Sequence, residues 1–162
     1  MKTRKITTLG LSVALALILS YVESLLPPLM AVPGVKVGLP NLVILFLLYR
    51  YGWKEAAAVS GLRLLLTAAL FTGFAAFFYG LSGAVLSLAG AALLKRSGRF
   101  SPLGVSAAGG VLHNLGQIAL AALVLDSGYI FAYLPVLLLS GTAAGALVGL
   151  LAGILIRRAD VK

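Results

Sequence analysis

The residues of this chain with the clearest capacity for chemistry are polar side chains that interrupt long apolar runs. Arg63 is the most costly of them, because a guanidinium loses its solvation in apolar surroundings. Ser60 and Thr67 stand three residues before it and four residues after it, which places all three on one face of a helix. An arginine in this setting either forms a structural ion pair, for which Glu23 is the candidate, or holds the carboxylate or phosphate of a ligand.

A second group of polar residues lies in a later apolar run. His113 and Gln117 are one helical turn apart, and Asn114 borders the same face. Such residues can form hydrogen bonds between helices, worth about 0.6 kcal/mol each, or they can orient the polar edges of a bound molecule. The residue types alone leave both interpretations open.

Further polar residues stand at the edges of these runs. Lys36 and Asn41 flank a segment that contains Gly38 and Pro40 and precedes a short apolar run. Irregular backbone at membrane depth is tolerated only where it lines a cavity or is buried in protein, so this segment is a candidate lid or half-helix. The sequence thus predicts a polar cavity that opens outward and carries positive charge at its floor. Its expected ligand-binding residues are Arg63, His113, Asn114, Gln117, Asn41, Lys36, Glu23 and Thr67.

The same inventory argues against several kinds of chemistry. The chain has no cysteine, one histidine and only four acidic residues, which are scattered at positions 23, 55, 126 and 160. Two-metal diphosphate chemistry needs clustered carboxylates, and a zinc site needs several histidine or cysteine ligands. No G-x-x-x-x-G-K-[ST] motif is present to hold the phosphates of ATP. We therefore expect no catalytic residue, no metal site and no cofactor, and we expect that the protein is not an enzyme.

The elements that position these residues are expected to be membrane helices. The chain is 61% hydrophobic and 10% charged, whereas a soluble domain carries about 25% charged residues. We predict one all-α transmembrane domain over residues 1–162 with six helices. The expected spans are about 6–26, 41–51, 55–71, 73–94, 103–125 and 132–156. The second is short for a hydrocarbon core about 30 Å thick.

Basic residues predict the orientation of these helices. All of the 13 Lys and Arg residues except Lys36 and Arg63 fall in patches that a six-span threading places on one side. Because cytoplasmic loops carry an excess of Lys and Arg, both termini are expected in the cytoplasm. The net charge of +9 then favours contact with membrane lipid and not with nucleic acid. Met1–Leu19 also has features of a cleaved signal peptide, but the apolar run continues to Leu26 and is long enough to span.

Small residues recur at the spacing that permits close helix packing. The first run has a face of small residues suited either to internal packing or to docking of a partner subunit, and this face consists of Ser12, Ala16 and Ser20. The last run has glycine at every fourth position, which favours packing inside the bundle, at Gly141, Gly145, Gly149 and Gly153.

Several stretches resemble the Gx transporter family, whose members often carry the label heptaprenyl diphosphate synthase component I. They are PGVKVGLPN (33–41), GLRLLLTAAL (61–70), GLSGAVLSLAG (80–90), RFSPLGVSAAGGVLHNLGQ (99–117) and LPVLLLSG (134–141). The resemblance covers nearly the whole chain, and GVSAAGGVLHNLGQ is its most specific part. Pro40 stands where the family commonly has alanine, which would stiffen the expected lid.

The family is similar to the substrate-binding S components of energy-coupling-factor (ECF) transporters. These six-helix proteins bind a vitamin or another micronutrient from outside and work with a transmembrane T component and two ATPase subunits. The resemblance implies a substrate-binding subunit in the plasma membrane of a prokaryote. Its ligand would be a small anionic metabolite, vitamin-like or related to isoprenoids, flavins or quinones. The resemblance also implies docking to the T component through the first helix, where Ser12, Ala16 and Ser20 are the nearest match.

The alternative function is a membrane accessory subunit or scaffold for isoprenoid or quinone synthesis, or for flavin-linked electron transfer. The synthase label does not fit the residues as an activity of this chain, because nothing in the sequence resembles an Asp-rich prenyltransferase motif. A transporter subunit should retain a small molecule during purification, whereas a scaffold should retain a protein partner.

Overall fold

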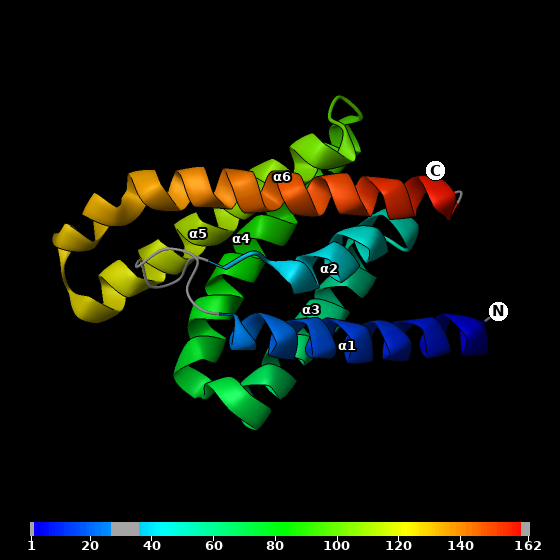
Figure 1. Ribbon diagram of the computed structural model, residues 1–162, viewed down its shortest axis with the longest axis horizontal. Helices are drawn as coiled ribbons and strands as arrows, with labels where there is room; N and C mark the ends of the chain where they lie inside the picture. Colours follow the sequence, from blue (N-terminus) through cyan, green and yellow to red (C-terminus); the bar gives the residue numbers. More distant parts are fainter. Residues whose placement is uncertain (1, 27–35, 160–162) are drawn as a thin grey trace.

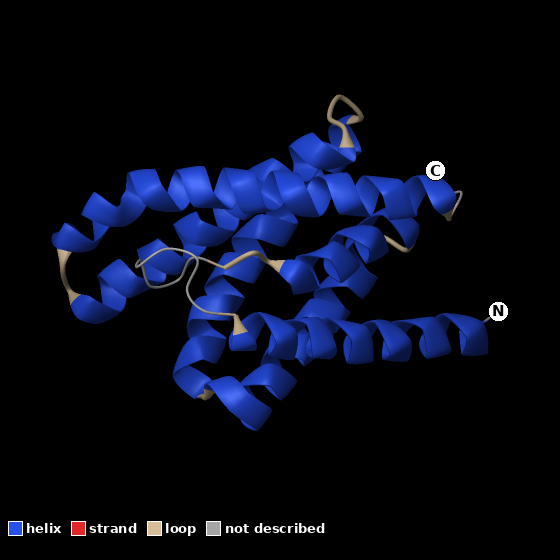
Figure 2. Ribbon diagram, viewed as in Figure 1, coloured by secondary structure: helices blue, strands red, loops and turns tan. Residues whose placement is uncertain are grey.

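The computed structural model describes residues 2–26 and 36–159, and these residues form helices without any strand (Figures 1 and 2). The α-helices are α1 (Lys2–Leu25), α2 (Leu39–Arg50), α3 (Trp53–Thr67), α4 (Phe74–Ser97), α5 (Pro102–Leu125) and α6 (Leu134–Arg158). A π-helical turn, Ala68–Thr72, continues α3, and a 3₁₀ helix, Gly128–Tyr133, leads into α6. The predicted all-α class is confirmed. Residues 27–35, between the first two expected spans, lie outside the described residues.

Five helical segments among the described residues are long and apolar enough to cross a membrane. They are Thr3–Leu25, Trp53–Thr72, Phe74–Ser97, Pro102–Leu125 and Gly128–Arg158. The 12 residues of α2 extend over only about 18 Å, well short of a hydrocarbon core about 30 Å thick. Six α-helices are present near the six predicted positions, but only five segments of the described residues are long enough to span, so the predicted count of six transmembrane spans stays a prediction.

The helix ends follow from local sequence. The hydroxyl of Ser101 accepts a hydrogen bond from the Gly104 N–H at 3.3 Å, and Pro102 occupies the first turn of α5. Both features satisfy or remove backbone donors that a helix start leaves free. At the other end of the α4–α5 connection, Gly98 adopts a left-handed conformation (φ 67°) that stops α4.

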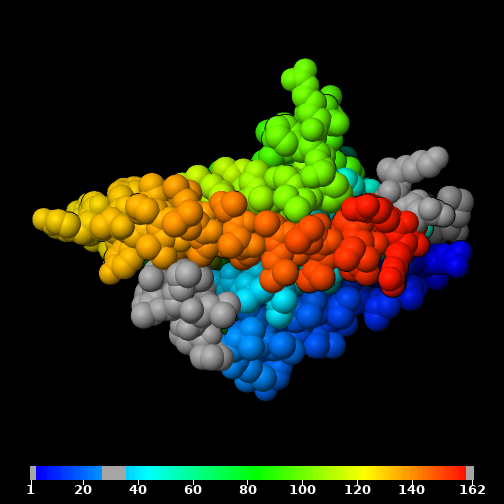
Figure 3. Space-filling model, turned by 45° about the horizontal axis from the view of Figure 1, so that its top comes forward, coloured from blue at the N-terminus to red at the C-terminus, as the bar shows by residue number. Residues whose placement is uncertain are grey.

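The short helix α2 lies at the centre of the fold. Figure 3 shows it as cyan atoms between the orange and red surface of α6 and the blue surface of α1. Leu47 and Leu48 are 0% and 2% exposed, and they belong to a core that also contains Ala16 of α1, Val105 of α5 and Ala152 of α6. The element that cannot span the membrane alone is thus enclosed by those that can.

Charged side chains from neighbouring helices hold both ends of α2. The carboxylate of Glu23 accepts hydrogen bonds from the backbone N–H groups of Gly38, at 2.5 Å, and Leu39, at 3.4 Å. At the other end, the Lys95 ammonium donates to the backbone carbonyls of Leu48, at 2.7 Å, and Tyr49, at 3.4 Å. A carboxylate at the start of a helix and an ammonium at its end both match the helix dipole. These contacts also satisfy backbone groups for which an apolar environment offers no water.

Helices α5 and α6 pack at close range along the glycine stripe of α6. A Cβ atom on Gly141 or Gly145 would lie 2.8 Å or 2.5 Å from a backbone carbonyl oxygen of α5. On Gly149 it would lie 2.7 Å from the Cα of Leu103. Gly153 has only an ordinary contact of 3.9 Å with Pro102. The stripe is packed inside the bundle, as expected, and it loosens at its last residue.

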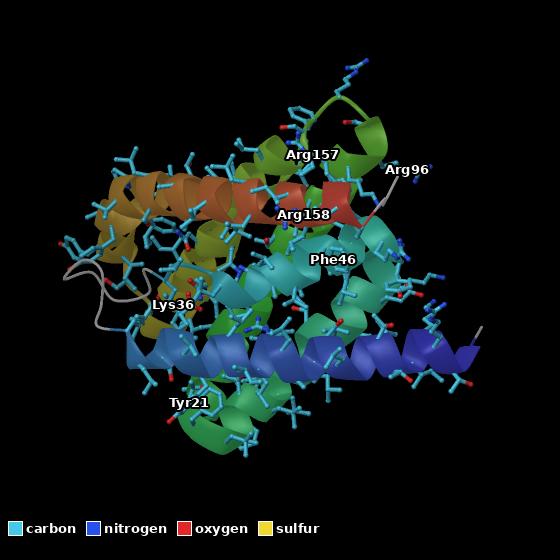
Figure 4. The ribbon with its side chains drawn as sticks, turned by 45° about the vertical axis from the view of Figure 1, so that its right-hand side comes forward. Tyr21, Lys36, Phe46, Arg96, Arg157 and Arg158 are labelled. Carbon is cyan, nitrogen blue, oxygen red and sulfur yellow. The ribbon has the colours of Figure 1, made fainter. Side chains whose placement is uncertain are left out.

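The ends of the helices separate into two sides. In Figure 1 the start of α1, the end of α6 and the α2–α3 turn lie towards the right, and the α4–α5 turn lies at the top. The end of α1 and the α3–α4 and α5–α6 turns lie towards the lower left. Figure 4 places Arg96, Arg157 and Arg158 on the first side, and Lys36 and Tyr21 away from it. The fold thus gathers the basic ends of α1, α4 and α6 on one side of the described structure.

Candidate functional site

A cavity of about 160 Å³ lies between the helices, and all six α-helices contribute to its wall. The structure brings around this one cavity residues that are far apart in the sequence. Every residue expected to bind a ligand is in its lining: Arg63, His113, Asn114, Gln117, Asn41, Lys36, Glu23 and Thr67. The predicted juxtaposition is therefore present. The role of these residues in binding stays a prediction.

Arg63 is the most unusual residue of the lining. Arg63 is only 7% exposed. One guanidinium nitrogen donates a hydrogen bond to the Ser20 hydroxyl at 3.1 Å, but the buried Nε atom has no hydrogen-bond partner. No carboxylate of the described residues forms an ion pair with it. The alternative of a direct Glu23–Arg63 ion pair is not formed, since the salt bridge found among the described residues joins Lys5 and Glu55, and the Glu23 carboxylate contacts the start of α2. The guanidinium thus borders the cavity without a carboxylate of the described residues in contact, and the charge of Glu23 reaches it only from beyond ion-pair distance.

Thr67 adds a second unsatisfied polar atom one turn from Arg63. Its Oγ1 atom is buried without a hydrogen-bond partner, and both residues line the cavity. The π-helical turn begins directly after it, where the Thr72 hydroxyl donates to the Thr67 carbonyl at 3.3 Å. Single π-helical turns are frequent at functional sites. Two buried polar atoms without partners on one wall are what a site shows when a ligand or water completes it.

The polar residues of α5 divide between structure and cavity. The Asn114 amide donates to the Leu137 carbonyl at 2.6 Å, which ties α5 to α6. The side-chain nitrogen of Asn114 therefore forms a hydrogen bond between helices. The ring of His113 lies against α4, where a Cβ on Gly83 would come within 2.8 Å of its Nδ1 atom. Gln117 lines the cavity one turn further along.

The rim of the cavity is formed by the segment that precedes α2. Lys36 is exposed and still lines the cavity, whereas Asn41 is half-buried in the first turn of α2. The Asn41 N–H donates to the Gly38 carbonyl at 2.9 Å, and Gly38 holds a left-handed conformation (φ 78°). Because Glu23 holds the Gly38 N–H, its observed role is to anchor this segment to α1.

The face expected to dock a partner points into the bundle. Ala16 is 0% exposed and belongs to the core, and Ser20 is 7% exposed and accepts the hydrogen bond from Arg63. Ser12 is half-buried, and α1 packs against α2 and α3. In this structure the Ser12, Ala16 and Ser20 face is therefore occupied by the chain's own helices. A partner helix would have to displace them or approach α1 from another side.

The cavity also contains residues that sequence reasoning did not assign to it. Ser20 was expected to dock a partner, and the Ser60 hydroxyl was noted only for its spacing from Arg63. The apolar part of the wall was not foreseen, because nothing separates a lining leucine from a lipid-facing one in a chain this apolar. It includes Leu45, Leu48, Leu88, Val105 and Val148, with the hydroxyls of Ser87 and Ser106 among them.

The described residues contain no group of three or more His, Cys, Asp or Glu side chains that could hold a metal ion.

Comparisons with curated proteins and with solved structures find no match. A comparison with protein families matches residues 12–155 to the family described as heptaprenyl diphosphate synthase component I. The match covers most of the chain and confirms the resemblance seen in the sequence. The chain therefore belongs to the heptaprenyl diphosphate synthase component I family.

Proposed function

We propose that this protein is the substrate-binding membrane subunit of an ECF-like uptake system and that it captures a small anionic molecule from outside. The observation that carries this proposal is the guanidinium of Arg63. It is buried beside a cavity to which all six helices contribute, and no carboxylate of the described residues contacts it. An ionised side chain at membrane depth is costly unless something pairs with it, so a ligand carboxylate or phosphate is the natural partner. Arginine binds either group with two parallel hydrogen bonds.

The size of the cavity limits the ligand. A volume of about 160 Å³ has room for roughly ten water-sized groups. A heptaprenyl chain contains far more heavy atoms than that, so the family description does not name the molecule that this cavity would enclose. We infer a compact metabolite, of vitamin size or smaller, with at least one negative charge.

The proposed subunit is not a catalyst. The described part of the lining offers a guanidinium, an imidazole, amides and hydroxyls, and the described residues contain no group of carboxylates suited to diphosphate chemistry. The energy for uptake would come from partners, namely an ECF-type T component and two ATPase subunits. The proposed setting is the plasma membrane of a prokaryote, with both termini in the cytoplasm and α2 as the sixth, partial, transmembrane segment.

The test is to purify the protein in mild detergent, extract it with solvent and identify co-purifying small anions by mass spectrometry. We expect an anion that is enriched in the wild type and lost from Arg63→Ala. The matched control is Arg96→Ala, because Arg96 is exposed at the end of α4 and away from the cavity. Recovery of a protein partner in place of any small molecule, together with no thermal shift by a panel of carboxylates and phosphates, would favour the scaffold.

A further inference from the structure

Two opposite charges line the cavity without touching each other. They are Glu23 and Arg63, and the salt bridge found among the described residues joins a different pair, Lys5 and Glu55. The charge of Glu23 reaches Arg63 from beyond ion-pair distance. A carboxylate and a guanidinium that share an apolar site normally pair, because a charge without a partner is costly there. Some feature of the fold therefore keeps these two side chains apart.

Each of the two charges is held by hydrogen bonds that do not involve the other. The Glu23 carboxylate accepts from the backbone N–H groups of Gly38 and Leu39 at the start of α2. The Nη1 atom of Arg63 donates to the Ser20 hydroxyl at 3.1 Å, which is the only side-chain hydrogen bond of Arg63 to a described residue. Ser20 thus has the main hold on the orientation of the guanidinium.

The Ser20 hydroxyl is arranged to accept a hydrogen bond. It donates its own hydrogen to the Ala16 carbonyl at 2.8 Å, one turn earlier on α1. A hydroxyl has a single hydrogen, so only its oxygen lone pairs are left for Arg63. Ser20 is also buried, which protects the contact from competing water. Ser20 can therefore hold the guanidinium but has no hydrogen to offer to an anion.

Glu23 is close enough to compete for Arg63. Ser20 and Glu23 stand three residues apart on α1, and side chains at this spacing share one helix face with Cβ atoms about 5–6 Å apart. A rotation of the Arg63 side chain would carry the guanidinium from the Ser20 oxygen towards the Glu23 carboxylate. An ion pair formed in this way would occupy the donors that a ligand needs.

We infer that Ser20 is a positioning residue of the anion subsite: its hydroxyl oxygen holds Arg63 short of Glu23, so that the guanidinium stays available to a carboxylate or phosphate in the cavity. This inference rests on the proposed function and adds the residue that keeps Arg63 from pairing within the chain. Ser20 acts through Arg63 and does not bind the anion itself.

The test measures anion binding to the whole protein in lipid nanodiscs by calorimetry. The probes are small carboxylates and monophosphates, from acetate and inorganic phosphate up to molecules of about ten heavy atoms. Ser20→Ala should weaken the binding of the tightest probe roughly ten-fold, because the anion must then displace Glu23 and order the Arg63 side chain. The matched control is Ser12→Ala, since the Ser12 hydroxyl likewise donates to a carbonyl one turn earlier, that of Thr8 at 2.8 Å, but is not joined to Arg63. Its affinity should equal that of the wild type.

Removal of the Glu23 charge should reverse the effect of Ser20→Ala. Glu23→Gln keeps a side-chain oxygen for the Gly38 N–H and removes the competing carboxylate. The double variant, Ser20→Ala with Glu23→Gln, should therefore regain the affinity of the wild type. A role of Ser20 in packing alone would not respond to the charge at position 23. Glu23→Gln by itself should bind the probes more tightly, because the anion no longer shares the cavity with a carboxylate.

The outcomes separate this inference from the proposed function. Wild-type affinity in Ser20→Ala, or a loss that Glu23→Gln does not restore, would overturn the positioning role and leave anion capture by Arg63 standing. If Ser20→Ala does not fold, Glu23→Gln alone decides. Tighter binding in Glu23→Gln would support the inference, whereas weaker binding would show that Glu23 positions Arg63 and would overturn it. If no probe binds the wild type, the proposed function fails and this inference fails with it.

Discussion

Arg63 carries a buried positive charge that no carboxylate of the described residues contacts directly, and this feature links stability to function. A buried charge without a partner destabilises a fold, so a protein that keeps one gains something from it elsewhere. The Ser20 hydroxyl gives the guanidinium one hydrogen bond and no charge. The remaining donors are available to a ligand, whose negative charge would relieve the cost.

The first prediction concerns the effect of Arg63 on stability and on anion binding. Arg63→Met should raise the melting temperature of the ligand-free protein, because it replaces an unmatched charge with an apolar side chain of similar length. The same variant should lose all stabilisation by anions. Arg63→Lys keeps the charge but loses the planar pair of donors, so it should bind anions more weakly than the wild type. Removal of one member of a buried charge pair costs about 2–5 kcal/mol, and calorimetry on Arg63→Ala would measure it.

A fall in the melting temperature of ligand-free Arg63→Met would contradict this account. It would mean that the guanidinium stabilises the bundle, through the charge of Glu23 or through its hydrogen bond to Ser20, and the charge would then be structural. Binding of the anion to Arg63→Lys as tightly as to the wild type would exclude a bidentate contact.

The second prediction uses the unsatisfied hydroxyl of Thr67. Thr67→Val removes a buried polar atom that has no partner and keeps the shape of the side chain. We expect the ligand-free protein to gain roughly 1 kcal/mol in stability and anion binding to weaken. The control is Thr142→Val, since the exposed Thr142 hydroxyl already donates to the Leu138 carbonyl at 2.8 Å. Thermal unfolding with and without ligand would measure both effects, the gain in stability and the weaker binding. A loss of stability in Thr67→Val would argue for a structural role.

At the scale of elements, α2 is the unusual one, because a short and very apolar helix is held at both ends by charges from other helices. Glu23 and Lys95 lie far from it in the sequence. Hydropathy predicts where α2 lies and that it is short. It cannot predict which distant side chains satisfy its ends, because that depends on how α1 and α4 pack around it.

The third prediction tests one of these contacts. Lys95→Met should destabilise the protein by about 1–2 kcal/mol, because the carbonyls at the end of α2 lose their charged donor. Hydrogen exchange should speed up first in the last turn of α2. Arg96→Met removes an adjacent but exposed charge and should leave the stability nearly unchanged. Equal effects of the two substitutions would mean that the Lys95 contacts contribute nothing beyond surface charge.

The glycine stripe of α6 gives a graded fourth prediction. Gly145→Ala would place a methyl group 2.5 Å from the Ser106 carbonyl oxygen, so α5 and α6 must separate. We expect a cost on the order of 1–3 kcal/mol. Gly153→Ala meets only an ordinary contact at 3.9 Å and should be neutral or slightly stabilising, because alanine favours the helix. Thermal unfolding of the two variants compares them directly, and equal melting temperatures would contradict the close packing.

At the scale of the whole molecule, sequence reasoning predicted the helices well and their contacts less well. Apolar runs and the breaks between them located all six helices to within a few residues, since the bilayer fixes the length and hydropathy of its spans. The eight polar residues share a cavity because burial in a membrane protein leaves few other places for them. The face of Ser12, Ala16 and Ser20 packs against the chain's own helices, and docking of a partner there stays a prediction, because small residues permit close approach without specifying whose helix approaches.

The fifth prediction is the topology that the charges imply. The chain has no cysteine, so single cysteines introduced at Ser97 and Ser127 report on one position each. Ser97 ends α4 beside Lys95 and Arg96, whereas Ser127 stands between α5 and the 3₁₀ helix, without basic neighbours. Because basic loops stay in the cytoplasm, a membrane-impermeant thiol reagent should label Ser127→Cys in intact cells. It should reach Ser97→Cys only after permeabilisation.

A third cysteine tests the placement of α2 in the same assay. Lys36 is exposed and lines the cavity, so Lys36→Cys should be labelled from the outside like Ser127→Cys. A bound anion should protect Lys36→Cys and leave Ser127→Cys unaffected, because only the former lines the cavity. Labelling of Ser97→Cys in intact cells would reverse the orientation. If Lys36→Cys reacts only after permeabilisation, the cavity opens towards the cytoplasm, and capture of a ligand from outside is excluded.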